Sequence, residues 1–118
     1  MSGDVSASIV SRMVSRRVIK RFAAEVAVRL KPKKIILFGS YAYGKPGDDS
    51  DVDLLVVMPG KGRPQDRALE IRERVAADFP MDLIVRTPSE LRQRLSLGDW
   101  FLKEIVEKGI VLYDAAHT

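Results

Sequence analysis

Two short apolar segments constrain the fold of this chain more than any other feature. The first runs from Ile35 to a Gly-Ser pair at 39–40, and the second, Asp51 to Val57, opens with two carboxylates one residue apart. Short apolar runs bounded by turn residues are typical of buried strands. Side chains alternate between the two faces of a strand, so Asp51 and Asp53 are predicted to point the same way. Two like charges on one face favour a cation between them, usually a divalent metal.

The Gly-Ser pair supplies features that complement these carboxylates. Gly39 lets a ligand approach the backbone closely, and Ser40 offers a hydroxyl and an N–H where a short helix could begin, which suits a phosphate group. Phosphate donors beside metal ligands predict a nucleotide bound as its magnesium salt. Each half alone is a weak signal, because Gly-Ser and Asp-x-Asp are common and aspartates often cap turns in loops. The conjunction of strand, Gly-Ser, ten residues, Asp-x-Asp and strand is much rarer.

This conjunction resembles the signature of a known superfamily. It consists of Leu37-Phe38-Gly39-Ser40, ten residues from Tyr41 to Ser50, and Asp51-Val52-Asp53-Leu54. The pattern is similar to that of the DNA polymerase beta-type nucleotidyltransferases, and in particular of the minimal nucleotidyltransferases, which are often encoded beside a HEPN-domain protein as toxin–antitoxin pairs. Similarity in element order covers about residues 35–113. Many minimal members carry arginines where this chain has Tyr41 and Tyr43.

Length and composition limit the remaining possibilities. The 118 residues predict one domain over 1–118, with an N-terminal helix at about 4–30 and a core at about 33–113. Cysteine is absent and His117 is the only histidine, which excludes thiol catalysis and a histidine triad and makes zinc a poor candidate. Oxygen ligands favour Mg²⁺, with Mn²⁺ as the alternative. No apolar run approaches the roughly 20 residues of a membrane span, and the expected location is the cytoplasm.

The N-terminal region has the pattern of a long amphipathic helix with a basic face. Apolar residues recur every fourth position from Val10 to Leu30, and Pro32 ends the pattern. The polar side carries five basic residues, Arg12, Arg16, Arg17, Lys20 and Arg21. A basic face is most simply a solvated surface, although like charges at this spacing also favour an anionic partner. The net charge of +4 is consistent with either interpretation.

Alternating helices and strands predict an α/β domain with a sheet of three to four strands and helices packed on it. A helix is expected from about Gln65 to Asp78 and a strand over 81–85. A capping box with proline at its first helical position, at 87–90, starts another helix, and Gly98-Asp99 separates it from the next. Ile110 to Tyr113 is predicted as the last strand. The resemblance implies that the sheet is mixed and strongly twisted.

Several candidate residues keep two interpretations. Asp82 is expected to be buried among apolar neighbours, either as the ion-pair partner of an arginine or as a third carboxylate of the metal site. The resemblance implies the second role, because the family carries its third acidic residue on the corresponding strand. Lys45 could contact a triphosphate or be a solvated loop lysine, and the tyrosines at 41 and 43 could stack on a base or shield the core. Trp100 and Phe101 cannot both face one core, so one of them lies at an interface or under a loop.

The resemblance implies metal-dependent nucleotidyl transfer, in which an acceptor hydroxyl attacks the α-phosphate of ATP or another nucleoside triphosphate. Asp51 and Asp53 would hold the metal, and Asp82 would serve the attacking oxygen as metal ligand or proton acceptor. Gly39 and Ser40, with Lys45, would bind phosphates. A second domain that holds the acceptor is not expected from this sequence, so the acceptor site is expected from another chain or a second copy. The implied acceptor is a tyrosine of a HEPN toxin, with this chain as the antitoxin.

Two other function classes compete with this hypothesis. A non-catalytic binding module would neutralise its partner by complex formation, and the two tyrosines in place of arginines are compatible with that. A nucleic-acid-binding domain would use the basic helix and show steep salt dependence. The second is the weaker alternative, because the aromatic residues expected between the basic ones for single-strand binding are missing. The sequence leaves open the nucleotide, the acceptor, the oligomeric state and whether catalysis is retained.

Overall fold

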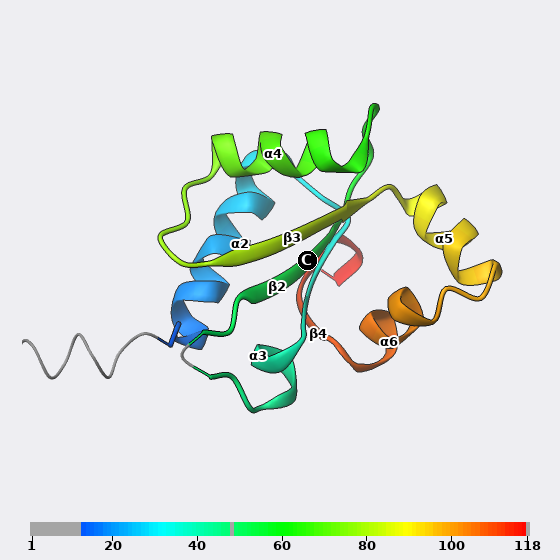
Figure 1. Ribbon diagram of the computed structural model, residues 1–118. Helices are drawn as coiled ribbons and strands as arrows, with labels where there is room; N and C mark the ends of the chain where they lie inside the picture. The colour runs from blue at the N-terminus through cyan, green and yellow to red at the C-terminus, as the bar shows by residue number, and fades with distance from the viewer. Residues whose placement is uncertain (1–12, 48, 118) are drawn as a thin grey trace, which may run out of the picture.

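A mixed four-stranded sheet lies at the centre of the computed structural model, which describes residues 13–47 and 49–117. Its strand order is β3-β2-β1-β4, and β1 is antiparallel to both β2 and β4 whereas β2 is parallel to β3 (Figure 1). The strands are β1 (Lys34–Phe38), β2 (Val52–Val57), β3 (Met81–Arg86) and β4 (Ile110–Asp114). The predicted α/β class with a mixed sheet is therefore confirmed.

Helices cover both faces of this sheet (Figure 1). The α-helices are α2 (Arg16–Leu30), α3 (Ser40–Tyr43), α4 (Pro64–Arg74), α5 (Pro88–Ser96) and α6 (Trp100–Lys108), and a 3-10 turn follows at Ala115–His117. Helices α2 and α4 pack on one face through buried residues such as Phe22, Val26 and Ile71. Helix α6, with support from α5, packs on the other face through Leu102 and Ile105.

The alternation along β2 determines on which face its carboxylate lies. Val52, Leu54 and Val56 belong to the core under α2 and α4, whereas Leu55 and Val57 belong to the core under α6. Successive strand residues point to opposite faces, so Asp53 shares the α6 face with Leu55 and Val57. The apolar run predicted from the sequence is thus buried on both sides, with one carboxylate at the start of the α6 face.

The N-terminal helix begins later than the sequence predicts. Residues 13–15 are not helical, so the expectation of one continuous helix from Asp4 to Leu30 is wrong over this stretch, and its part before residue 13 lies outside the described residues. Ser15 has an extended backbone and its hydroxyl accepts a hydrogen bond from the Val18 N–H, which makes it the N-cap of α2. The backbone N–H of Val14 donates instead to the Tyr41 hydroxyl at 3.0 Å. A tertiary contact and a local cap together end the helical pattern that periodicity alone would continue.

The other helix boundaries follow the predicted signals, with one exception. Thr87 and Glu90 form the expected capping box at the start of α5, and Asp99 caps α6 through a 3.0 Å bond from the Leu102 N–H. Helix α4 ends at Arg74 rather than near Asp78. Its C-cap residue has an extended backbone and a side chain buried in the core. No helix in the described part of the chain is long and apolar enough to cross a membrane.

Candidate active site

The turn between β1 and α3 has a backbone conformation that only glycine adopts readily. Gly39 has φ 72° and ψ −158°, a region closed to residues with a side chain. A Cβ atom added there would overlap a carboxylate oxygen of Asp53. Gly39 therefore does two things at once, because it makes the sharp turn and leaves room for a carboxylate directly beside the backbone.

Strand register brings the acidic groups to this corner, because Phe38, Asp53 and Asp82 are aligned across three neighbouring strands. Asp53 is the register partner of Phe38 on one side and of Asp82 on the other. Paired residues of adjacent strands point to the same face, so the carboxylates of Asp53 and Asp82 lie together on the α6 face. The side chain of Asp82 is exposed, so the expectation of a carboxylate buried among apolar neighbours is wrong. It lies at the start of an edge strand, on a part of the sheet that α6 leaves open.

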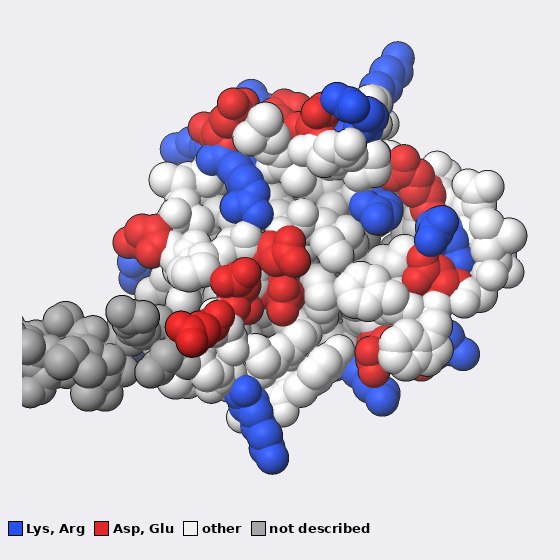
Figure 2. All heavy atoms as spheres, in the orientation of Figure 1, with Lys and Arg blue, Asp and Glu red and all other residues white. Residues whose placement is uncertain are grey.

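The environment of Asp53 disfavours its charge. Partial burial raises the pKa of the Asp53 carboxyl above its ordinary value, and the negative charges of Asp82 and Asp51 raise it further. Figure 2 shows acidic side chains gathered near the middle of this face, beside uncharged surface. The site therefore holds unfavourable negative charge that a cation would relieve.

A hollow of about 330 Å³ opens at these carboxylates. Its walls combine Asp53 and Asp82 with groups from β1, α3, β3 and α6, namely Phe38, Gly39, Tyr43, Ile84, Phe101, Glu104 and Ile105. Phe101 packs edge-on against Phe38, with ring centroids 5.8 Å apart. Glu104 is a site residue that was not predicted from the sequence. The signal was present, because Phe101, Glu104 and Ile105 are three and four residues apart and so share one face of a helix.

The two tyrosines of α3 have different surroundings. Tyr41 is buried, and its hydroxyl accepts the backbone N–H of Val14, so it shields the core and fastens the chain ahead of α2. Tyr43 is 47% exposed and lines the hollow. Burial raises the pKa of its hydroxyl, the Glu104 carboxylate raises it further, and a hydrogen bond with the Gly39 backbone opposes both. Tyr43 thus remains a neutral hydroxyl at the mouth of the site.

The remaining predicted site residues lie around the hollow without lining it. Asp51 is exposed and precedes β2, close enough to influence the Asp53 pKa. Ser40 opens α3, and its carbonyl accepts the backbone N–H groups of Gly44 and Lys45, both at 3.1 Å. The side chain of Lys45 is exposed in the loop after α3. Trp100 at the start of α6 is 72% exposed, so it is the outward-facing member of the aromatic pair.

The donor set suits a hard divalent cation that arrives with its substrate. Among residues 13–47 and 49–117, no three His, Cys, Asp or Glu side chains converge in an arrangement that could hold a metal ion. Mg²⁺ does not need such a cage, because it commonly binds one or two carboxylates and takes its other ligands from water and substrate phosphates. The carboxylates of Asp53 and Asp82, beside a glycine that keeps the backbone accessible, fit this pattern.

Comparison with known proteins identifies relatives of the whole domain. The family model of the nucleotidyltransferase domain matches residues 19–113. Two proteins of Methanocaldococcus jannaschii, each named "Putative protein adenylyltransferase", are 30% identical to this chain. One aligns over 98 residues, covering 79% of this chain and 93% of the relative, and the other over 103 residues, covering 86% and 100%.

Two solved structures share the fold. A crystal structure described as a putative nucleotidyltransferase from Sulfolobus solfataricus superposes with a TM-score of 0.58 at 23% identity, covering 85% of this chain and 80% of the other. A mutant form of the toxin–antitoxin MntA–HpeT superposes with a TM-score of 0.53 at 20% identity, covering 88% and 76%.

Proposed function

The chain belongs to the nucleotidyltransferase domain family, and on that premise we propose that it transfers AMP from ATP to a hydroxyl group of a partner protein. The activity class, a nucleotidyltransferase enzyme, follows from the family match and from relatives named as protein adenylyltransferases. The proposal concerns the nucleotide, the metal, the acceptor and the residues that act.

One observation carries the assignment of the site. Asp53 and Asp82 are register partners on the same face of the sheet. At this corner the Asp53 carboxylate occupies the space that a Cβ atom of residue 39 would need, so only glycine fits there. Structural carboxylates are usually paired with basic groups, whereas the two strongest electrostatic influences on Asp53 are other carboxylates. A site that concentrates negative charge beside an accessible backbone suits a cation-bound polyphosphate.

The residues have distinct roles in the proposed transfer. The acceptor hydroxyl oxygen forms a bond to the α-phosphorus of ATP, while the bond from that phosphorus to the oxygen bridging to the β-phosphate breaks and pyrophosphate leaves. Asp82 takes the proton of the attacking hydroxyl, because it is exposed on the side from which an acceptor can approach. The backbone at Gly39 and the hydroxyl of Ser40 bind the β- and γ-phosphates, and Lys45 adds a positive charge from the loop.

Magnesium is the proposed cofactor, with Mn²⁺ as a substitute. Asp53 would hold it together with phosphate oxygens of the substrate and one neighbouring carboxylate, which is Asp51 or, where Asp82 is not accepting the proton, Asp82. When bound, the ion neutralises charge on the phosphates and orients them for an in-line displacement. No protein nucleophile is required, since positioning and charge neutralisation account for catalysis of this kind.

The proposed acceptor is a tyrosine of a HEPN-domain toxin, which would make this chain its antitoxin. Three observations support a protein acceptor. The curated relatives are named as protein adenylyltransferases, a structure of the same fold is that of a toxin–antitoxin pair, and the hollow is open to solvent where the half-exposed ring of Phe101 lines it.

The test is incubation of the purified chain with labelled ATP, Mg²⁺ and the product of the neighbouring gene, followed by intact-mass analysis. We expect the partner to gain the mass of AMP. Asp53→Asn and Asp82→Asn should each abolish this gain, whereas Asp78→Asn, an exposed aspartate outside the hollow, should retain it. Full transfer by Asp53→Asn would refute the assigned site.

The rival binding module makes the opposite prediction for nucleotide dependence. If the chain neutralises its partner only by complex formation, neutralisation proceeds without ATP and is unaffected in Asp53→Asn. If transfer is required, neutralisation fails without ATP, and the variant forms the complex without relieving toxicity.

A further inference from the structure

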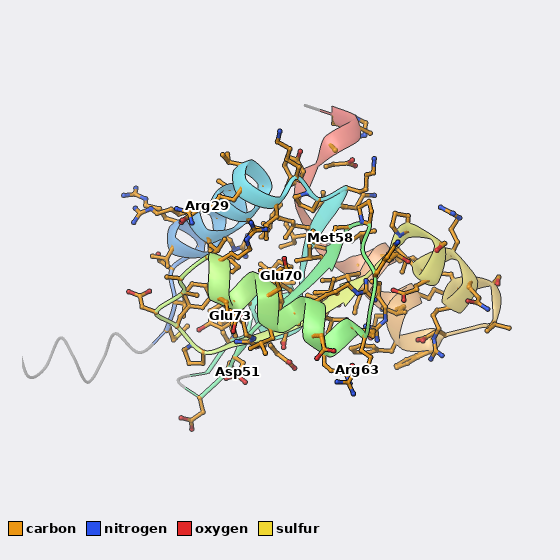
Figure 3. All side chains as sticks on the ribbon, turned by 90° about the horizontal axis from the view of Figure 1, so that it is seen from above. Arg29, Asp51, Met58, Arg63, Glu70 and Glu73 are labelled. Carbon is orange, nitrogen blue, oxygen red and sulfur yellow. The ribbon has the colours of Figure 1, made fainter. Side chains whose placement is uncertain are left out.

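A second hollow lies at the opposite end of β2 from the carboxylates. It has a volume of about 290 Å³ and is bordered by the end of α2, the loop after β2 and the side of α4 that carries Arg67 and Ile71. In Figure 3, Arg29, Met58 and Glu70 lie around it, whereas Asp51 lies outside this group, beyond Glu73. Pro59 follows Asp53 by six residue steps along an extended stretch of chain, so these two residues, one at each hollow, are roughly 20 Å apart.

The lining of this hollow, which we call the α2–α4 hollow, is predominantly basic. Its charged residues are Arg29, Lys61, Arg67, Arg74 and Glu70. Glu70 is already engaged by Arg74 at 3.6 Å, and Arg29 donates to the Arg74 carbonyl at 2.8 Å while pairing with Glu25 outside the lining. Arg67 is paired with Glu90, so with Glu25 and Glu70 four cations face three carboxylates, and the net positive charge that remains, about that of Lys61, favours an anionic ligand.

Arg67 gives this hollow an incompletely satisfied guanidinium. Its side chain is only 8% exposed, and its Nη2 donates to both carboxylate oxygens of Glu90 at 3.0 Å. Its Nε and Nη1 are buried and have no hydrogen-bond partner. An unpaired buried donor costs on the order of 1–3 kcal/mol, so such a group calls for an explanation. A ligand that accepts these two donors would remove the cost.

The loop over Arg67 is built to lie close to it. A Cβ atom at Gly60 would lie 2.9 Å from Cδ of Arg67, so glycine is needed for this approach. Gly62, two residues further on, has φ 89° and has open space around it. Two glycines flanking Lys61 therefore form a segment that can shift with little steric cost and expose the guanidinium below.

We propose that the α2–α4 hollow is a second binding site, for a phosphate-bearing anion. A guanidinium presents donors in a planar fork that matches phosphate oxygens, and a phosphate group keeps further oxygens for Lys61 after two of them accept from the free Arg67 donors. The volume lies at the lower end of that of small-molecule sites, which suits inorganic phosphate or a small phosphomonoester. The anion takes the free donors of Arg67, and Lys61 closes over it with the glycine loop.

The test is NMR titration of the ¹⁵N-labelled full chain with sodium phosphate and, separately, with AMP, at constant ionic strength maintained with sodium chloride. We expect saturable shifts of the Gly60, Lys61 and Gly62 amides. Saturation by phosphate identifies a free-phosphate site, and saturation by AMP alone identifies a phosphomonoester site. No saturable shift at these amides with either probe, or shifts confined to Gly39 and Ser40, would overturn the proposal.

Surface variants keep the test independent of folding defects. The double variant Lys61→Ala/Arg74→Ala removes two exposed charges of the lining. We expect it to lower the affinity for the anion, measured by the same titration, at least tenfold. Lys103→Ala, an exposed lysine on α6 outside the hollow, should leave the affinity unchanged. Arg67→Lys keeps a positive charge near Glu90 but lacks the guanidinium donors, and we expect it to lose the saturable amide shifts. Equal affinity in the double variant and the unsubstituted chain would contradict the site.

Discussion

Replacing Asp53 by asparagine should stabilise the fold while removing activity. The side chain keeps its shape but loses a charge that its surroundings disfavour, since partial burial and the carboxylates of Asp82 and Asp51 all raise its pKa. Carboxylates that repel one another in the absence of a bound cation lower the stability of the fold, so removing one of the charges raises it. Stability and transfer are therefore expected to change in opposite directions.

The magnitude can be worked from the strand pairing. Asp53 and Asp82 are partners on neighbouring strands, which lie about 5 Å apart. Two unit charges at that separation repel by roughly 0.8 kcal/mol in bulk water and roughly 3 kcal/mol at the effective dielectric near a protein surface. Because Asp82 is exposed, the lower end applies, and we expect a gain of about 1 kcal/mol. For a domain of this size that raises the melting temperature by about 3–5 °C.

The gain in folding stability of Asp53→Asn should increase as the pH rises. The folded-state pKa of Asp53 is raised, so its ionised form destabilises the fold once the pH exceeds the ordinary value of 3.8 for the unfolded chain. Below that value both states are protonated and the penalty disappears. The melting-temperature difference between Asp53→Asn and the unsubstituted chain should therefore be near zero at about pH 3.5 and grow to its full size by pH 7. Thermal melts followed by circular dichroism across this range measure it.

Two results would refute this reasoning. A variant less stable than the unsubstituted chain at pH 7 would mean that Asp53 is held by favourable contacts rather than by repulsive ones. A stability difference that does not change with pH would mean that the effect is not electrostatic. The matched control is Asp78→Asn, which removes an exposed carboxylate elsewhere and should shift the melting temperature by less than about 1 °C.

Three further predictions concern the supports of the site. Gly39→Ala should cost at least about 2 kcal/mol in a urea melt, from backbone strain and overlap with the facing carboxylate, and a neutral result would contradict the turn geometry. Glu90→Gln should cost about 2 kcal/mol at pH 7, since it leaves the Arg67 guanidinium uncompensated. A backbone N–H at Thr87 and then Arg67 lower the Glu90 pKa, so this loss should shrink below about pH 4; a constant loss would exclude the ion pair. Tyr41→Phe should cost about 1 kcal/mol in the same melt and leave transfer intact, and lost transfer would assign Tyr41 to the substrate.

The local elements of the site were predictable because their causes lie within a few residues. The turn at Gly39, the strand that follows Asp51 and the capping box at Thr87 each depend on backbone geometry and neighbouring side chains, and all are present as predicted. Side chains two residues apart on a strand point to the same face, so the orientation of a strand carboxylate relative to those neighbours was also predictable. Function could be inferred early for the same reason, since the motif that carries the chemistry is local.

Nonlocal features were not accessible in the same way. The exposed Asp82, the carboxylate of Glu104 and the contact of Phe101 with Phe38 depend on which strands are neighbours and on how far α6 covers the sheet. The start of α2 depends on a hydrogen bond to Tyr41, 27 residues away in the chain. Helical periodicity cannot register such a contact.

The sequence by itself determined which segments become strands, the capped starts of α5 and α6, and that Gly39 and Asp53 belong to one motif, because short-range sterics and side-chain alternation decide these points. Only the tertiary structure decided which carboxylates meet and how exposed each one is, because that depends on parallel pairing of β2 with β3. It also placed Arg67 beneath the loop after β2 with two donors unused, a consequence of packing between α4, α5 and that loop.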